Sequence, residues 1–147
     1  MKRIITGILA VLLLWNLSGC RGGGVTENAV VDLGTSEQFS QAELESAVEC
    51  LKTYFHSGSF YDCTMEEIWY DEEDSKRCAA SYLAGANGEV ADGITAENVI
   101  SLFGTFTTGA NPNKSFSPYA TYPYRWLMIR DHADSPWRMD MRGSGQG

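Results

Sequence analysis

The sequence has few of the residues that carry common enzyme chemistry. Only two of its 147 residues are histidine, His56 and His132, and they lie far apart in the chain. No G-x-S-x-G, H-E-x-x-H or phosphate-binding glycine loop occurs, which argues against the enzyme classes that these motifs mark. The cysteines form no C-x-x-C pair, so zinc-binding patterns are missing too. We therefore expect no metal and no cofactor, and the sequence designates no catalytic residue.

Basic residues are also scarce. Eleven lysines and arginines stand against 19 aspartates and glutamates, which gives a net charge of −8. Residues 1–19 hold two of the basic residues and no acidic one, so their removal takes the net charge from −8 to −10. An acidic surface repels nucleic acid and anionic lipid, so neither is expected to bind the folded domain.

No apolar run is long enough to span a bilayer, which takes about 20 residues. The longest runs from Ile4 to Trp15, is interrupted by Thr6 and Gly7, and follows two basic residues. A charged start followed by a short apolar stretch is typical of a secretory signal peptide. Residues 1–19 are accordingly predicted to be a leader for export.

The leader ends in Leu17-Ser18-Gly19-Cys20, which resembles the lipobox of bacterial lipoproteins. The resemblance implies that a diacylglyceryl group is attached to the thiol of Cys20 and that cleavage leaves Cys20 as the first residue. Two or more acyl chains give stable anchoring, at about 0.8 kcal/mol per buried CH₂ group. We expect a protein anchored by lipid to the extracytoplasmic face of the cell membrane. The alternative is an ordinary signal peptide followed by a chance cysteine.

The rest of the chain divides by composition into a tether, one domain and a tail. Residues 20–38 are expected to form the lipidated cysteine and a flexible tether, because 21–37 contain several glycines and little periodicity. A coil of this size reaches roughly 20–25 Å. Residues 39–142 hold nearly all of the patterned sequence and are expected to form a single domain, with a disordered tail at 143–147.

Two segments of this domain are predicted to be helices. Ser40 and Glu43 form a capping box, and apolar residues then recur at helical spacing as far as Phe55. The acidic run 71–74 suits the start of a second helix that ends near Leu83, because the helix dipole favours negative charge there. A calcium loop is the alternative for this run, but the central glycine of such a loop is missing.

The remaining patterned segments are predicted to be strands, at 63–70, 97–107, 122–130 and 137–142. Gly104 is expected to mark a bulge or a close approach of two chains. The order of elements predicts an α+β fold, in which an N-terminal helix and a second helix pack on one face of a curved antiparallel sheet of about four strands.

Three cysteines remain besides Cys20, namely Cys50, Cys63 and Cys78. Export permits disulfide formation, and an odd number leaves one thiol over. We predict a disulfide between Cys50 and Cys63, because they lie at the end of a helix and the start of a strand. Three unpaired thiols are the alternative.

Five short segments carry a family resemblance: AVEC (47–50), FYDC (60–63), IWYDE (68–72), WLMIR (126–130) and WRMD (137–140). They resemble a family of small uncharacterised lipoproteins from Gram-positive anaerobes. The arrangement is also similar to the cystatin-like cone of ketosteroid isomerases and nuclear transport factor two. That similarity implies a curved sheet wrapped on a helix, with a cleft that some relatives use for catalysis or for ligands.

Aromatic residues are the remaining candidates for a binding site. They would line one concave wall for a carbohydrate, a peptide or a small apolar ligand, or else they form the core. The residues concerned are Trp69, Tyr70, Tyr124 and Trp126, together with Tyr122 and Trp137.

Three functions remain open. The first is a non-enzymatic binding domain, anchored to the membrane, for an envelope protein or a small ligand. The second is a cone-fold enzyme or ligand carrier that uses the concave face of the sheet, with Asp140 and a tyrosine as a possible acid–base pair. The third is an immunity-type protein that guards the envelope of its own cell.

Overall fold

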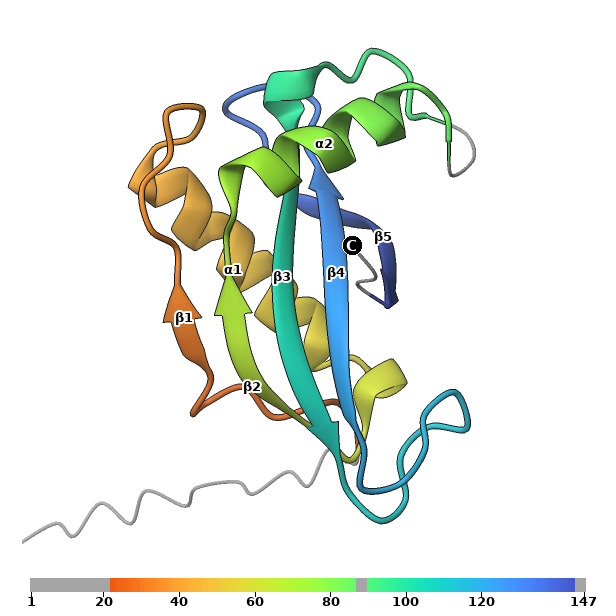
Figure 1. Cartoon of the computed structure of the whole chain (residues 1–147). Coiled ribbons are helices and arrows are strands. Elements are labelled where there is room, and N and C mark those ends of the chain that lie inside the picture. Colours follow the sequence, from red (N-terminus) through yellow and green to blue (C-terminus); the bar gives the residue numbers. More distant parts are fainter. Residues whose placement is uncertain (1–21, 87–89, 145–147) are drawn as a thin grey trace, which may run out of the picture.

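The computed structural model of the chain describes residues 22–86 and 90–144. Cys20 and the leader lie outside these residues. Two helices and a five-stranded sheet make up the fold (Figure 1). The elements are β1 (Val30–Asp32), α1 (Gln41–Phe55), β2 (Cys63–Trp69), α2 (Glu72–Leu83), β3 (Val99–Thr108), β4 (Thr121–Ile129) and β5 (Arg138–Ser144), with short 3-10 helices at Gly58–Phe60 and Ala96–Asn98.

The strands lie in the order β1-β2-β3-β4-β5, so each strand pairs with its neighbour in sequence. β2 to β5 are antiparallel, as expected, whereas β1 runs parallel to β2. The sheet is therefore mixed and five-stranded, and the expectation of about four antiparallel strands missed the first one. β5 extends to Ser144, so residues 143 and 144 belong to the sheet and not to a disordered tail.

Residues 24–33 do not form the expected flexible tether. The backbone N–H of Gly24 donates to the carbonyl of Phe55 at 2.8 Å, and the N–H of Val25 donates to the carbonyl of Cys63 at 2.9 Å. Farther along, β1 pairs with β2. A strand of three residues is too short to show the alternation that marks longer strands, so the glycines beside it dominated the prediction.

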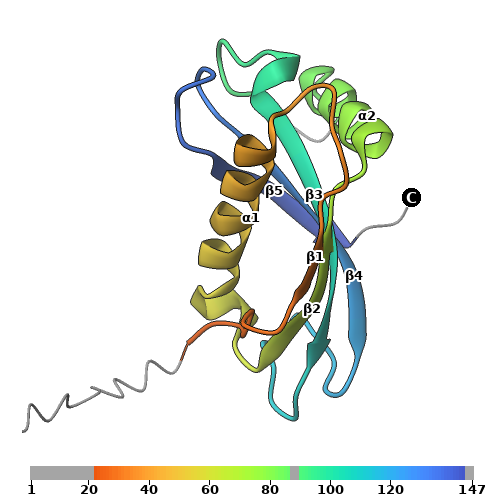
Figure 2. The same ribbon diagram turned by 90° about the vertical axis from the view of Figure 1, so that its left-hand side faces the viewer.

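The two helices cover opposite faces of the sheet (Figure 2). α1 packs on the face that carries Leu102 and Trp126, and α2 packs on part of the other face, against Leu127 and Ile129. The expectation that both helices share one face is wrong. Because β3 and β4 carry apolar residues on both faces, each face needs its own cover.

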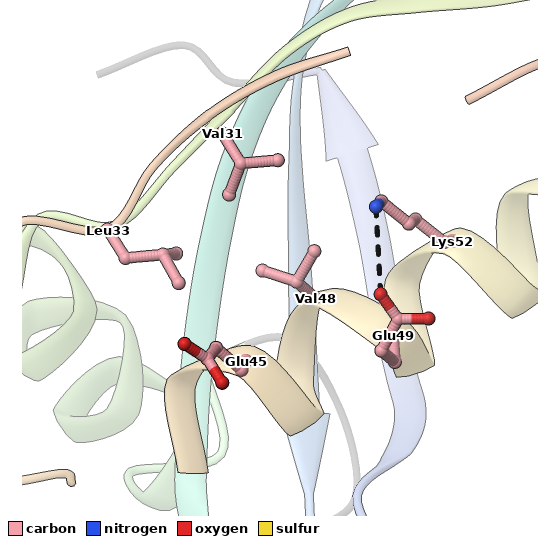
Figure 3. Close-up of a pocket in the computed structure, with 6 residues that line it drawn as sticks. All are labelled: Val31, Leu33, Glu45, Val48, Glu49 and Lys52. Carbon is pink, nitrogen blue, oxygen red and sulfur yellow. Dashed lines mark ion pairs between the residues drawn. The ribbon is translucent and has the colours of Figure 1, made fainter. Parts of the chain in front are cut away.

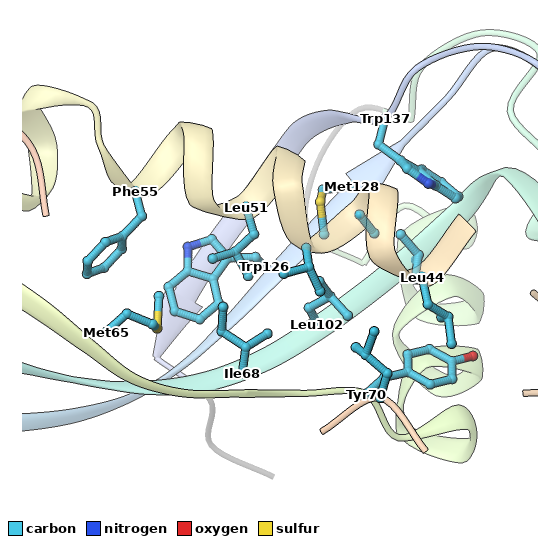
Figure 4. Close-up of a cluster of buried hydrophobic side chains, with 14 of the residues drawn as sticks. Leu44, Leu51, Phe55, Met65, Ile68, Tyr70, Leu102, Trp126, Met128 and Trp137 are labelled. Atoms are coloured by element: carbon cyan, nitrogen blue, oxygen red, sulfur yellow. The ribbon is translucent and has the colours of Figure 1, made fainter. Parts of the chain in front are cut away.

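The main hydrophobic core lies between α1 and the sheet (Figure 4). Trp126, from β4, is completely buried there. A Cβ atom at Gly104 would collide with the carbonyl oxygen of Glu67 and lie 3.2 Å from the ring of Trp126, so this glycine is a close approach. The buried face of α1 consists of Leu44, Ala47, Val48, Leu51 and Phe55, as the helical spacing predicted.

A buried arginine joins the start of α1 to the β4–β5 connection. Arg130 is 4% exposed, and its guanidinium lies 4.3 Å from the ring centre of Trp137. It forms an ion pair with Glu43 at 2.7 Å and donates to the side chain of Asn98 and to two backbone carbonyls. A buried charge is tolerated when it is paired and hydrogen-bonded in this way. The hydrogen bond from the Ser40 N–H, with a further one from Arg130, lowers the pKa of Glu43.

Replacing this arginine tests its structural role. We expect Arg130→Met to lower the free energy of unfolding by about 3–5 kcal/mol, because several buried partners lose their donor at once. Arg138→Met is the matched control, since Arg138 is 48% exposed and pairs with an exposed Asp131. It should cost no more than about 1 kcal/mol. Urea denaturation measures both values, and equal losses would contradict the assignment.

Candidate functional site

Three of the aromatic residues proposed to line a binding wall belong to the core. Trp126, Trp137 and Tyr70 are 0%, 7% and 8% exposed. They lie in the layer between α1 and the sheet (Figure 4). Because α1 fills that face, these residues offer no open wall to a ligand, and the alternative of core packing is correct for them.

The other three aromatic candidates lie on two faces of the sheet. Tyr122 and Tyr124 are half-buried and pack against Phe106, at ring distances of 5.4 Å each. Trp69 lies on the opposite face, where its ring stacks on Phe103 at 6.1 Å. Five of the six aromatic residues therefore belong to the core beneath α1 or pack against it, and Trp69 lies on the other face.

The three cysteines of the domain are free thiols, so the expected Cys50–Cys63 disulfide is wrong. The thiol of Cys50, on α1, donates to the carbonyl of Trp137, which precedes β5. Cys63 begins β2, which β3 and β4 separate from β5 in the sheet. Burial, aided by the charge of Asp62, raises the pKa of Cys63 to about 11. This thiol stays protonated and unreactive at neutral pH.

Alkylation checks the state of these thiols. In urea without a reducing agent, we expect Cys50, Cys63 and Cys78 all to be labelled. The folded domain should react far more slowly, because Cys63 and Cys78 are buried and the attacking species is the thiolate. The readout is the mass of the alkylated protein, and protection of two thiols in urea would show a disulfide.

The titratable residues of 22–86 and 90–144 form no candidate metal site. No group of three or more His, Cys, Asp or Glu side chains gathers in a way that would hold a metal ion there. His56 caps the end of α1 and lies 3.1 Å from the hydroxyl of Thr26. His132 lies in the turn after β4, 2.6 Å from the hydroxyl of Ser135. Among the same residues, no helix has the length and apolarity to cross a membrane.

A groove between β1 and α1 is the candidate binding site (Figure 3). Its volume is about 340 Å³, within the range of ligand sites. β1 and the residue after it supply Val31 and Leu33, and α1 supplies the opposite wall. The complete lining is Val31, Leu33, Glu45, Val48, Glu49 and Lys52.

The groove has an apolar floor and a charged rim. Val31, Leu33 and Val48 point toward one another across it (Figure 3). On the α1 side, the Lys52 ammonium lies 3.6 Å from the carboxylate of Glu49. Glu45 accepts a hydrogen bond from the neutral side chain of Gln41. Because Lys52 balances only one of the two glutamates, the rim keeps one excess negative charge.

β1 also forms one edge of the sheet. Within residues 22–86 and 90–144, no strand pairs with its outer side. Edge strands present a row of backbone N–H and C=O groups that another chain can pair with. The side chains of Val30 and Val31 are 64% and 39% exposed, unusually high values for valine. The sequence signal for this site was the apolar stretch AVVDL (29–33) inside the segment assigned to a tether.

Comparison of the chain with protein-family models, with curated proteins and with solved structures found no match. The lipoprotein family and the cystatin-like cone therefore stay predictions. The fold places the chain in the class of α+β domains with a mixed open sheet. The function has to be inferred from the chemistry of the chain itself.

Proposed function

We propose that this protein is a lipid-anchored extracytoplasmic domain that binds an extended peptide segment of an envelope protein in the groove between β1 and α1. The observation that carries the proposal is the outer edge of β1, which no strand of the described residues pairs with, directly beside an apolar groove. Peptides commonly bind such edges by adding a strand to the sheet.

The anchor follows from the leader and the lipobox. A short apolar leader, two basic residues before it and Cys20 at its end all fit a lipoprotein signal. Such a protein is held on the outer side of the cell membrane, where its partners are other envelope proteins. An acidic domain at this location is a poor partner for nucleic acid.

The edge and the groove suit an extended peptide in complementary ways. The backbone of the peptide would pair with the outer edge of β1, as a further strand does. Alternate side chains of a strand point to the same face, so every second residue would enter the groove. The floor of Val31, Leu33 and Val48 favours apolar side chains at those positions.

The rim adds a preference for basic residues. Glu49 already pairs with Lys52, so Glu45 is the carboxylate more open to a lysine or arginine of the peptide. Charge pairs at the rim of an interface contribute more to selectivity and association rate than to affinity. The proposed ligand is thus an extended segment of alternating apolar residues with a basic residue near Glu45.

The alternative of an enzyme or ligand carrier that uses the concave face has less support. α1 covers that face, and the completely buried Trp126 fills the space beneath it. Asp140 lies on β5 and interacts with the hydroxyl of Tyr82, which α2 places on the face opposite α1.

Membrane fractionation tests the anchor. In cells that express the full chain, we expect Cys20→Ala to move the protein from the membrane fraction to the soluble or secreted fraction. Cys50→Ala is the control, since it also removes one thiol but leaves the lipobox intact. Retention of the Cys20→Ala protein on membranes would contradict lipid anchoring.

Peptide selection tests the groove. Peptides selected from a random library against the mature chain with Cys20→Ser should shift the amide NMR signals of residues 30–33. Val31→Glu should weaken their binding by roughly tenfold or more, because it places a charge on the apolar floor. Val30→Glu is the matched control, since the neighbouring side chain does not line the groove. Equal effects of both variants, or shifts confined to other elements, would contradict the proposal.

A further inference from the structure

Two glycines that follow the lipobox cysteine are docked on the end of α1. Gly23 has a φ of +103°, and a Cβ atom there would collide with the carbonyl oxygen of His56. A Cβ atom at Gly24 would collide with the ring of Phe55, whose carbonyl also accepts the Gly24 N–H. Only glycine fits such contacts without a shift of the backbone. The chain is therefore held against the domain from Gly23 onward.

This docking limits how far the domain can move from its anchor. Three Cα–Cα steps of about 3.8 Å join Cys20 to Gly23, so their separation is at most about 11 Å. A flexible tether through residue 37 would have allowed roughly twice that distance. A lipidated Cys20 lies at the bilayer surface, so the part of the domain around Gly23 must lie there too.

The end of the domain around Gly23 also contains two connections, which we call the tip: residues 56–62 and the β3–β4 connection, 109–120 (Figures 1 and 2). The carbonyl of Asp62 accepts the N–H of Gly109 at 2.7 Å, and its carboxylate accepts the N–H of Asn111 at 2.6 Å. These bonds join the two connections into one ordered surface.

We infer that this tip faces the membrane at close range and that its exposed tyrosines contact the lipid headgroup region. The inference rests on the lipid anchor proposed above. In place of a domain on the expected flexible tether, it gives a domain of fixed orientation. The tip lies toward the bilayer and the β4–β5 turn, residues 131–136, lies away from it.

The chemistry of the tip suits an interface with lipid. Tyr119 is 81% exposed and Tyr61 is 39% exposed, and tyrosine is enriched where membranes meet water. The connection 109–120 carries one charge, that of Lys114, and Asp62 uses its carboxylate within the tip. The acidic run 71–74 begins α2, and this helix lies toward the opposite end of the sheet (Figure 1). Repulsion by anionic lipid therefore favours the same orientation.

The backbone of the tip holds Tyr119 outward. Its φ is +53°, in the left-handed region, which is unfavourable for a residue with a Cβ atom. Its N–H donates to the carbonyl of Gly109 at 3.0 Å, and the next N–H, of Ala120, donates to the hydroxyl of Thr108 at 2.9 Å. These bonds compensate for an unfavourable backbone conformation that leaves a large aromatic side chain in solvent.

Paramagnetic broadening tests the orientation. The full lipoprotein, labelled with ¹⁵N, is placed in nanodiscs of phosphatidylcholine that contain a small fraction of lipid with a gadolinium chelate on its headgroup. We expect the amide signals of the tip to broaden strongly, Tyr119 included, while those of residues 131–136 stay sharp. Even broadening over the domain, or broadening that is strongest at 131–136, would overturn the inference.

A variant with a longer tether tests whether the short link to the anchor fixes the orientation of the domain. About 15 Gly and Ser residues inserted between Arg21 and Gly22 give the domain a flexible leash without changing its docked glycines. The difference in signal broadening between the tip and residues 131–136 should then become smaller. An unchanged difference would overturn the role of the short tether. Failure of the anchor is seen separately, as a mature N-terminus without lipid mass and a protein absent from nanodiscs. That result would overturn both the proposed function and this inference.

Discussion

Arg130 and Glu43 meet at 2.7 Å, with the Arg130 guanidinium over the ring of Trp137, and this contact fixes the N-terminal end of α1 to the connection between β4 and β5. The indole N–H of Trp137 donates to the carbonyl of Glu43 and adds a second link. At the other end of α1, Gly24 bonds to Phe55. The helix is thus held at both ends, and the core beneath it, the groove beside it and the tip beyond it all depend on its position.

The segment between the lipobox and α1 carries two proposed roles with few residues. Gly23 and Gly24 fix the domain close to its anchor, and β1 forms both an edge of the sheet and one wall of the groove. With the tip toward the membrane, the strands run away from the bilayer (Figures 1 and 2). The groove is lined by residues of β1 and α1, at the edge of the sheet. A partner in the envelope would reach the edge of β1 laterally, without displacing the tip from the lipid.

Local chemistry made most of the elements predictable. The capping box of Ser40 and Glu43 sets the start of α1, and Asp71 caps α2 through the N–H of Asp74. The patterned segment 97–107 was predicted to be a strand and contains β3, and Gly104 marks a close approach. In each case neighbours in sequence, or the alternation of one strand, determine the structure.

The features that were missed depend on contacts between distant segments. β1 is three residues long and forms only by pairing with β2, so its own sequence shows little. Cys50 and Cys63 are close in sequence, but one thiol faces Trp137 and the other lies at the start of β2. The aromatic residues were predicted to line a binding wall or else to form the core, and only the path of α1 determines that Trp126 is core.

Amide hydrogen exchange of the mature protein tests most directly whether the segment after Cys20 belongs to the folded domain. The N–H groups of Gly24 and Val25 donate to backbone carbonyls in the structure, so both should exchange well below the random-coil rate. Exchange at the random-coil rate for both, while the amides of α1 stay protected, would show a free tether. That result would contradict both the docked glycines and the fixed approach of the domain to the membrane.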